Sequence, residues 1–171
     1  MTQNLVTDSA TGAVPDDWTG RFVTLTFERD VAVPLAVLWN VWTAPAARAV
    51  WAAPSPSVTV EFLEADTRVG GREISICRGE GHPDIRCECG WLELQPARCS
   101  VNYEVISSEG VTQSVALVTA DISGTHESSR LGLTVQLSSL AEDMEAGYRE
   151  GFSAALDNLV STAERTMVLQ R

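Results

Sequence analysis

No apolar run in the 171-residue sequence approaches the roughly 20 residues that a membrane-spanning helix needs, which argues against a transmembrane protein. The first residues lack the basic start and apolar stretch of a secretory signal, so we expect a cytoplasmic protein with reduced thiols. Basic residues are also scarce, with 12 against 23 acidic ones, and the formal charge of -11 repels phosphate backbones and anionic lipid headgroups. The sequence therefore predicts no nucleic-acid partner and no membrane partner.

Side chains that could attack a substrate or titrate near neutral pH are few. The two histidines, His82 and His126, fall in expected hairpin turns, where a solvated loop residue is the simpler interpretation. No spacing suggests a serine–histidine–aspartate triad, and the glycine pair at 70–71 fits a hairpin turn better than a phosphate-binding loop. We therefore predict no covalent catalysis and no cofactor, and the sequence leaves open whether any reaction is catalysed.

The chain does contain a series of short segments with alternating apolar and polar residues. Residues 21–29 alternate as a half-buried strand does, and two short helices are expected next, one starting at Pro34 and the other ending at Trp51. Short turns without crossover helices separate the later segments, which predicts an antiparallel sheet. The further strands are expected at 58–63, 72–78, 85–94, 100–106, 112–122 and 128–137.

The C-terminal region has the spacing of a long amphipathic helix. Its apolar positions recur three and four residues apart, at Tyr148, Phe152, Leu156, Leu159, Ala163 and Met167. A long terminal helix over a curved sheet usually covers a cavity. We therefore expect one α+β domain over residues 21–171, in the order β-α-α-β-β-β-β-β-β-α, with residues 1–20 as a flexible N-terminal arm.

Several motifs resemble those of a known family. Residues 33–45 are similar to its A-P-x-x-x-V-W-x-x-W-T-x-P segment, and residues 50–54 to the W-W-x-P that follows. The turn at 69–72 resembles P-G-G-R, and residues 91–98 resemble Y-L-E-I-x-P-P-E-R. The helix at 151–159 resembles G-W-x-x-x-L-x-x-L. In order and spacing the chain resembles the activator of heat-shock-protein-90 ATPase homologues, within the START-like (polyketide cyclase, SRPBCC) superfamily.

The resemblance implies a helix-grip fold. In this fold a curved antiparallel sheet of about seven strands wraps around the long C-terminal helix, with a hydrophobic cavity between them. The resemblance implies no single reaction, because the superfamily includes lipid carriers, cyclases, hormone receptors and co-chaperone domains.

Charged residues on the expected strands could fix the polar end of a ligand. Arg72 and Arg78 share a strand face with Ile74 and Ile76, so an arginine at the cavity mouth could hold a ligand carboxylate. Glu61, Glu73, Glu88 and Glu93 are strand acids, and an inward Glu61 or Glu93 with a raised pKa could act as a general acid or base. The pattern does not decide whether Glu61 and Glu93 point inward or to solvent.

Aromatic residues could stack a planar ligand at the cavity mouth, although packing without a ligand explains them equally well. The residues that we expect to contact a ligand are Trp42, Trp51, Arg72, Ile74, Ile76, Arg78, Trp91, Glu93, Tyr103, Phe152 and Leu156.

Four cysteines, Cys77, Cys87, Cys89 and Cys99, fall in consecutive strands. Cys87 and Cys89 must face the same side, because strand side chains alternate. A zinc site would need the other two thiols beside them, and a C-x-C on a strand spreads its sulfurs apart, so we expect free thiols and no metal.

The sequence therefore favours binding of a small hydrophobic or aromatic molecule between the sheet and the C-terminal helix. Two alternatives remain. The first is a cyclase- or hydrolase-type enzyme that uses the same cavity. The second is a protein-interaction module, similar to a co-chaperone, or a homodimer whose cavity is vestigial.

Overall fold

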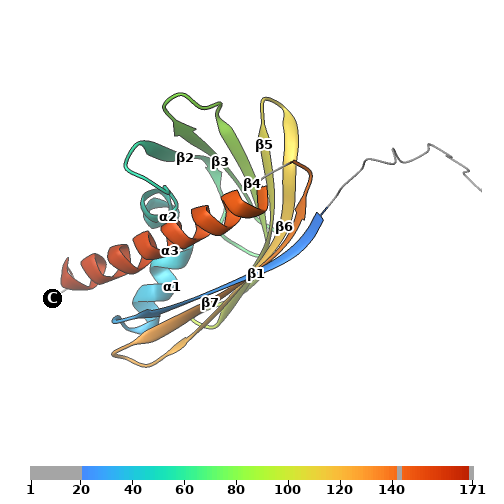
Figure 1. Cartoon of the computed structure of the whole chain (residues 1–171). Helices are drawn as coiled ribbons and strands as arrows, with labels where there is room; N and C mark the ends of the chain where they lie inside the picture. The colour runs from blue at the N-terminus through green and yellow to red at the C-terminus, as the bar shows by residue number, and fades with distance from the viewer. Residues whose placement is uncertain (1–20, 142–143, 170–171) are drawn as a thin grey trace, which may run out of the picture.

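One strongly curved antiparallel sheet holds the helices on its concave side (Figure 1). The computed structural model describes residues 21–141 and 144–169, so the arm predicted at 1–20 lies outside the described residues. The observed order confirms the fold class predicted from the sequence. The elements are β1 (Arg21–Val31), α1 (Leu35–Thr43), α2 (Pro45–Trp51), β2 (Val58–Ala65), β3 (Arg72–Gly79), β4 (Ile85–Gln95), β5 (Cys99–Ser108), β6 (Val111–Gly124), β7 (Ser129–Ser139) and α3 (Met144–Leu169).

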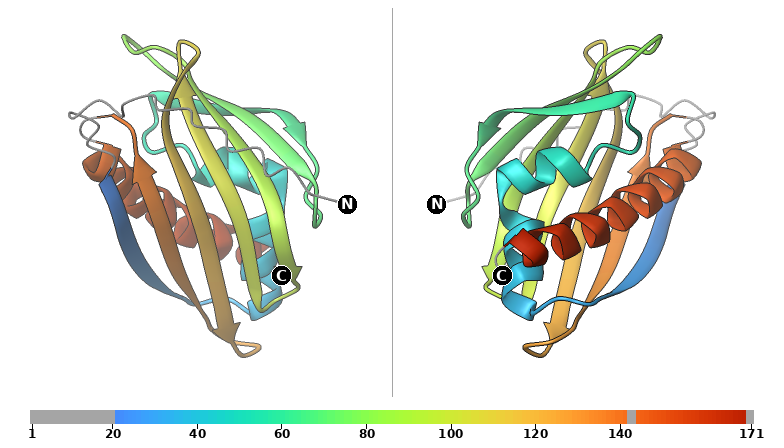
Figure 2. Two further views of the ribbon diagram at one scale, coloured as in Figure 1. Left: turned by 90° about the vertical axis from the view of Figure 1, so that its right-hand side faces the viewer. Right: turned by 90° about the vertical axis from the view of Figure 1, so that its left-hand side faces the viewer.

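The seven strands lie in the order β1-β7-β6-β5-β4-β3-β2. Strands β2 to β7 pair with their neighbours along the chain, whereas β1 pairs with β7, the last strand. Figure 2 shows the outer, convex face of the sheet in one view and all three helices on the opposite side in the other. Every side chain on the concave face therefore points toward a helix or into the space beside it.

The concave face of β1, β6 and β7 forms the hydrophobic core. On β7 the residues at alternate positions, from Leu131 to Leu137, are buried. One of these buried residues, Val135, pairs with Leu25 of β1 on one side and with Val118 of β6 on the other. Leu156 and Leu159 of α3 are buried in the same cluster. Burial of these apolar side chains is the main stabilising contribution that holds α3 against the sheet.

Two stacked tryptophans hold the short helices against the sheet. The rings of Trp42 on α1 and Trp51 on α2 lie 5.3 Å apart and nearly parallel. Trp42 Nε1 donates a hydrogen bond to Ser100 Oγ at 2.9 Å, and Trp51 Nε1 donates to the Val41 carbonyl at 2.8 Å. Both buried indole N–H groups are thus satisfied, as burial of a polar group requires.

The turn between β2 and β3 depends on its two glycines. Gly70 has a φ of 76°, a left-handed conformation that favours glycine. At Gly71 an added Cβ would lie 2.0 Å from the Asp66 carbonyl oxygen. The Gly70 amide and the Gly71 carbonyl both hydrogen bond to the Trp91 backbone, so the turn is fixed to β4. The glycine pair at 70–71 therefore has a structural role in the turn between β2 and β3.

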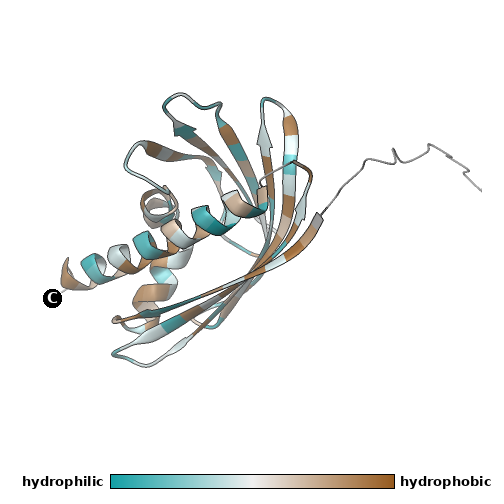
Figure 3. Ribbon diagram, viewed as in Figure 1, coloured by the Kyte–Doolittle hydropathy of each residue, from teal (hydrophilic) through white to brown (hydrophobic). Residues whose placement is uncertain are grey.

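Helix α3 lies across the sheet with alternating apolar and polar segments, whereas α1 is largely apolar (Figure 3). Arg29 of β1 connects the polar side of α3 to the sheet, because its Nε donates to Asp157 Oδ1 at 2.8 Å and its Nη2 donates to Ser153. Among the helices of the described residues, none has the length and hydrophobicity that crossing a membrane requires.

A polar row on the concave face

The concave face of β3, β4 and β5 is polar where that of β1, β6 and β7 is apolar. Glu73 of β3 lies opposite Cys89 of β4, and Cys89 lies opposite Glu104 of β5. Glu73 hydrogen bonds to α2 and Glu104 to α3, which shows that the row faces the helices. We call Glu73, Cys89 and Glu104, together with Arg48, Cys87 and Tyr148 around them, the polar row.

Arg48 of α2 and Glu73 form an ion pair at one end of the polar row. An Arg48 Nη1–H donates to Glu73 Oε2, and Thr67 Oγ1 donates to Glu73 Oε1 at 2.7 Å. The exposed fractions of the Arg48 and Glu73 side chains are 16% and 2%. The Arg48 guanidinium also lies 5.1 Å from the ring centres of Phe62 and Trp91. This end of the row is therefore a charge-balanced contact that fixes α2 on the sheet.

Glu104 lies at the other end of the polar row, where it accepts a hydrogen bond from a neutral donor. Tyr148 Oη donates to Glu104 Oε1 at 2.8 Å, so the Ser114 hydroxyl, 3.1 Å from Tyr148 Oη, donates in turn to the tyrosine. Cys87 lies on the neighbouring strand β4, close enough to affect the pKa of Glu104. Within the described residues Glu104 makes no ion pair.

Burial controls the protonation of these groups. It raises the pKa of Glu104, while hydrogen bonds from Tyr148 and Cys87 and the positive charge of Arg48 offset part of the increase. Burial also raises the pKa of Cys89 to about 12 and that of Cys87 well above its ordinary value. Both thiols therefore remain protonated and act as weak hydrogen-bond donors rather than nucleophiles. Burial thus favours the neutral form of the Glu104 carboxyl group.

Aromatic rings on α3 and β1 continue the site beside Glu104. The ring centre of Phe152 lies 5.8 Å from that of Tyr148 and 5.9 Å from that of Phe27, each pair being tilted. Phe27, Phe152, Cys87 and Glu104 are all half-buried. The site thus has an apolar aromatic side and a polar side with an acid.

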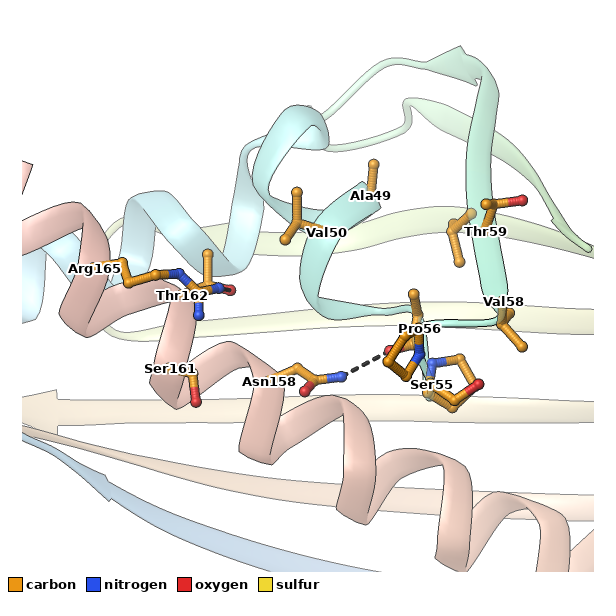
Figure 4. A pocket seen from close by; sticks show the side chains of 13 residues that line it. Ala49, Val50, Ser55, Pro56, Val58, Thr59, Asn158, Ser161, Thr162 and Arg165 are labelled. Carbon is orange, nitrogen blue, oxygen red and sulfur yellow. Dashed lines mark hydrogen bonds between the residues drawn. The ribbon is translucent and has the colours of Figure 1, made fainter.

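A cavity of about 520 Å³ opens at the β2 end of the concave side, between the α2–β2 loop and the C-terminal half of α3 (Figure 4). Its lining includes Val58 and Val60 of β2 and Thr162 and Arg165 of α3. Asn158 Nδ2 donates to the Ala53 carbonyl at 2.7 Å and holds the loop against the helix. The volume falls within the range of about 300–1,000 Å³ that is usual for small-molecule sites.

The structure separates the predicted ligand contacts into two groups. Trp42, Trp51, Trp91, Phe152 and Leu156 lie on the concave side, although all except Phe152 are buried in the protein interior. Trp91 Nε1 is buried and, within the described residues, has no hydrogen-bond partner. Phe152 is therefore the predicted contact that remains accessible beside the polar row.

The other predicted contacts lie on the convex face, which corrects the expectation that they line the cavity. Because Glu73 points inward, its neighbours Arg72 and Ile74 must point outward, and Ile76 and Arg78 follow the same alternation. Arg72 pairs with Glu64 and Glu88, and Arg78 with Glu61 and Asp84, at the surface.

Tyr103 and Glu93 also lie on the convex face. The Tyr103 ring covers Gly90, where an added Cβ would lie 2.1 Å from the ring, and Glu93 is exposed opposite Val101. Glu61 lies opposite Ile76 on the same convex face. The two acids considered for catalysis, Glu61 and Glu93, are therefore outside the concave site.

The sequence interpretation missed Arg48, Glu104 and the hydroxyl of Tyr148. Two signals were present. Arg48 is a lone arginine in an otherwise apolar seven-residue helix. Ser100, Asn102 and Glu104 form a polar series at every second position of one strand. A polar face on a central strand indicates an unusual environment, because sheet interiors are normally apolar.

The four cysteines remain free thiols, and Cys77, Cys87 and Cys89 share the concave face. In the part of the chain that the structure describes, no group of three or more histidine, cysteine or acidic side chains is placed to hold a metal ion.

Residues 32–164 match the family described as Activator of Hsp90 ATPase homolog 1-like protein. The chain belongs to this family. The match confirms the START-like resemblance found in the sequence motifs. Among curated proteins, none matches the chain significantly.

Several solved structures share the fold of this chain. An uncharacterised protein from Rhizobium leguminosarum is 22% identical with a TM-score of 0.76, covering 86% of this chain and 97% of its own. Mll3558 from Rhizobium loti is 23% identical with a TM-score of 0.74, covering 83% and 97%. CV1439 from Chromobacterium violaceum is 21% identical with a TM-score of 0.73, covering 82% and 96%. At these identities the similarity establishes the helix-grip fold and no particular ligand.

The raised pKa of Glu104 predicts a pH-dependent effect of the substitution Glu104→Gln on stability. Below the unfolded-state pKa both states are protonated. As the pH rises toward the higher folded-state pKa, the unfolded chain loses its proton first, so the ionisable Glu104 progressively destabilises the wild type. Glutamine cannot ionise, so the variant should gain stability relative to the wild type from about pH 4 upward.

Urea unfolding of both proteins across this pH range would measure the difference. The charged or titratable groups that act on Glu104 are Tyr148, Cys87 and Arg48, and none of them changes charge in this range. Glu93→Gln on the convex face is the control and should show no such trend. Parallel stability curves for Glu104→Gln and the wild type would contradict the prediction.

Proposed function

We propose that the protein binds a small molecule with an apolar or aromatic body on the concave face, between β3–β5 and the N-terminal half of α3. One observation carries the proposal. On β3, β4 and β5 the carboxyl groups of Glu73 and Glu104 and the thiols of Cys87 and Cys89 point toward the helices, while apolar residues such as Ile74, Ile76 and Val105 point away. A sheet that only packed against a helix would have the reverse arrangement.

The concave face offers both parts of a ligand site. Phe27 and Phe152 supply an accessible aromatic surface, and Glu104 with Tyr148 supplies a hydrogen-bonding end. Such a combination of apolar walls and a few polar groups is typical of small-molecule sites. The proposal replaces Arg72, Arg78 and Glu93 by Glu104 and Tyr148 as the groups that orient the polar end.

Binding of the neutral fluorescent probe N-phenyl-1-naphthylamine would test this function. We expect saturable binding with a fluorescence increase in the wild type. Ser75 lies on the concave face opposite Cys87, so Ser75→Phe should fill the site and weaken probe binding at least about tenfold. The matched control is Ile76→Phe, the next residue on the same strand, which points to the convex face and should leave affinity within about twofold.

The function would be overturned if the wild type did not bind the probe, or if both phenylalanine variants lost binding equally. Thermal unfolding of both variants would show that each is folded. Native mass spectrometry of the purified protein, with a denaturing control, would report a co-purified ligand by mass. The same spectrum tests our expectation that the protein can form a homodimer.

The enzyme alternative now depends on Glu104. Its raised pKa and its hydrogen bond from Tyr148 suit a general acid or base, whereas Glu61 and Glu93 lie on the other face. Turnover of a bound compound that is lost in Glu104→Gln, with binding retained, would establish this alternative.

A further inference from the structure

Glu104 differs from the other acid of the polar row in its partners. Glu73 has a cationic partner, Arg48, and a hydroxyl donor, Thr67. Glu104 accepts a hydrogen bond from a neutral donor, Tyr148, and in the described part of the chain it has no cationic partner within ion-pair distance. A buried carboxylate without a counter-charge is costly, so such a group either takes up a proton or pairs with a cation.

Two arginines on the concave side already have acidic partners, and a third, Arg165 near the C-terminal end of α3, donates a hydrogen bond to Thr162. Arg48 pairs with Glu73, and Arg29 pairs with Asp157 on α3. Neither can approach Glu104 without leaving a carboxylate unpaired. The charge of Glu104 is therefore available to a molecule that enters the site.

The surroundings of Glu104 favour a cation. The face of an aromatic ring attracts positive charge, and the ring of Tyr148, whose hydroxyl contacts the carboxyl group, lies beside that of Phe152, which lies beside Phe27 in turn. The formal charge of the whole chain is -11, which raises the local concentration of cations and lowers that of anions. A carboxylate beside aromatic rings is a common arrangement for binding an organic ammonium group.

Resting on the proposed function, we propose that the ligand is a hydrophobic amine whose protonated nitrogen pairs with Glu104 while its apolar body contacts Phe152 and Phe27. The ammonium group supplies the missing counter-charge and donates a hydrogen bond to the carboxylate. Tyr148 keeps its own hydrogen bond to Glu104, so it positions the carboxylate.

Three probes with the same ring system would test the proposal. These are 1-naphthylmethylamine, which is cationic at neutral pH, 1-naphthalenemethanol, which is neutral, and 1-naphthoate, which is anionic. Each is titrated against the protein saturated with N-phenyl-1-naphthylamine, and displacement gives its affinity. We expect the amine to bind at least about tenfold more tightly than the alcohol, and the carboxylate to bind most weakly.

Substitutions would show whether Glu104 causes the preference for the amine over the alcohol. Glu104→Gln should lower the affinity for the amine to within about threefold of the affinity for the alcohol, and it should leave the affinity for the alcohol almost unchanged. Glu93→Gln removes the same charge from the convex face and is the matched control, so it should keep the preference for the amine. Equal effects of the two substitutions would mean that net charge alone attracts the amine, and would overturn the proposal.

The wild-type comparison is decisive even if Glu104→Gln does not fold. Equal affinity for amine and alcohol would overturn the amine proposal and leave the proposed function standing. Tightest binding of the carboxylate would overturn it in favour of an anion site at Arg48. Failure of all three probes and of N-phenyl-1-naphthylamine to bind would instead overturn the proposed function itself.

Discussion

The substitution Arg48→Met should lower the free energy of unfolding by about 3–5 kcal/mol, because it leaves Glu73 as a buried charge without a cation. The Glu73 side chain is only 2% exposed, and Thr67 would be its remaining hydrogen-bond donor. Methionine keeps the length and most of the apolar contact of the arginine side chain. Urea denaturation at neutral pH would measure the loss.

A double substitution separates the charge from the packing. Arg48→Met combined with Glu73→Gln removes both charges, so it should recover most of the stability lost in Arg48→Met. The coupling energy between the two sites should exceed about 1 kcal/mol. The control is Arg78→Met on the convex face, where an exposed ion pair contributes little. The assignment of Arg48 and Glu73 as a buried pair would be wrong if Arg48→Met were no more harmful than Arg78→Met.

Leu156→Ala should be nearly as destabilising, at about 3–5 kcal/mol, because truncation of a core leucine removes apolar burial and leaves a cavity. Leu156 is 1% exposed and belongs to the core cluster that holds α3 against the sheet. Thermal or urea unfolding would measure the effect. The control on the same helix is Val168→Ala, where the side chain is 70% exposed and the change should stay within about 0.5 kcal/mol.

This second experiment also decides between two roles for Leu156. The sequence suggested that Leu156 contacts a ligand, whereas the structure places it in the core. A core role predicts a large loss of stability and almost unchanged probe affinity in the folded variant. A small loss of stability with weakened probe binding would mean that Leu156 lines an open cavity instead.

Much of the fold could be predicted from local pattern and turn chemistry. The segment expected at 72–78 is found as β3 (Arg72–Gly79), and the helix that starts after Pro34 is found as α1 (Leu35–Thr43). These elements depend on short-range rules, such as proline at a helix start and glycine in a left-handed turn. The C-terminal helix begins at Met144, four residues before Tyr148, where the predicted apolar pattern starts. The pattern missed this first turn because few apolar residues mark it.

The site was predicted less well because alternation does not say which face of a strand is inside. On β5 the sequence interpretation expected Tyr103 to contact a ligand, yet Asn102 and Glu104 face the helices and Tyr103 faces away. On β3 the same reversal placed Arg72 and Arg78 outside and Glu73 inside. Hydrophobicity was an unreliable guide on these strands, because the convex residues cover one another while the concave residues form polar contacts with α2 and α3.

The sequence by itself determined the family, the order of the elements and the pairing of neighbouring strands, because each depends on residues close together in the chain. The direction of curvature, and with it the face that meets the helices, was decided only by the tertiary structure. Arg48 and Glu73, 25 residues apart, and Glu104 and Tyr148, 44 apart, meet because packing of α2 and α3 against one face brings them together. Contacts of this kind depend on the whole arrangement of the core, and no local pattern encodes them.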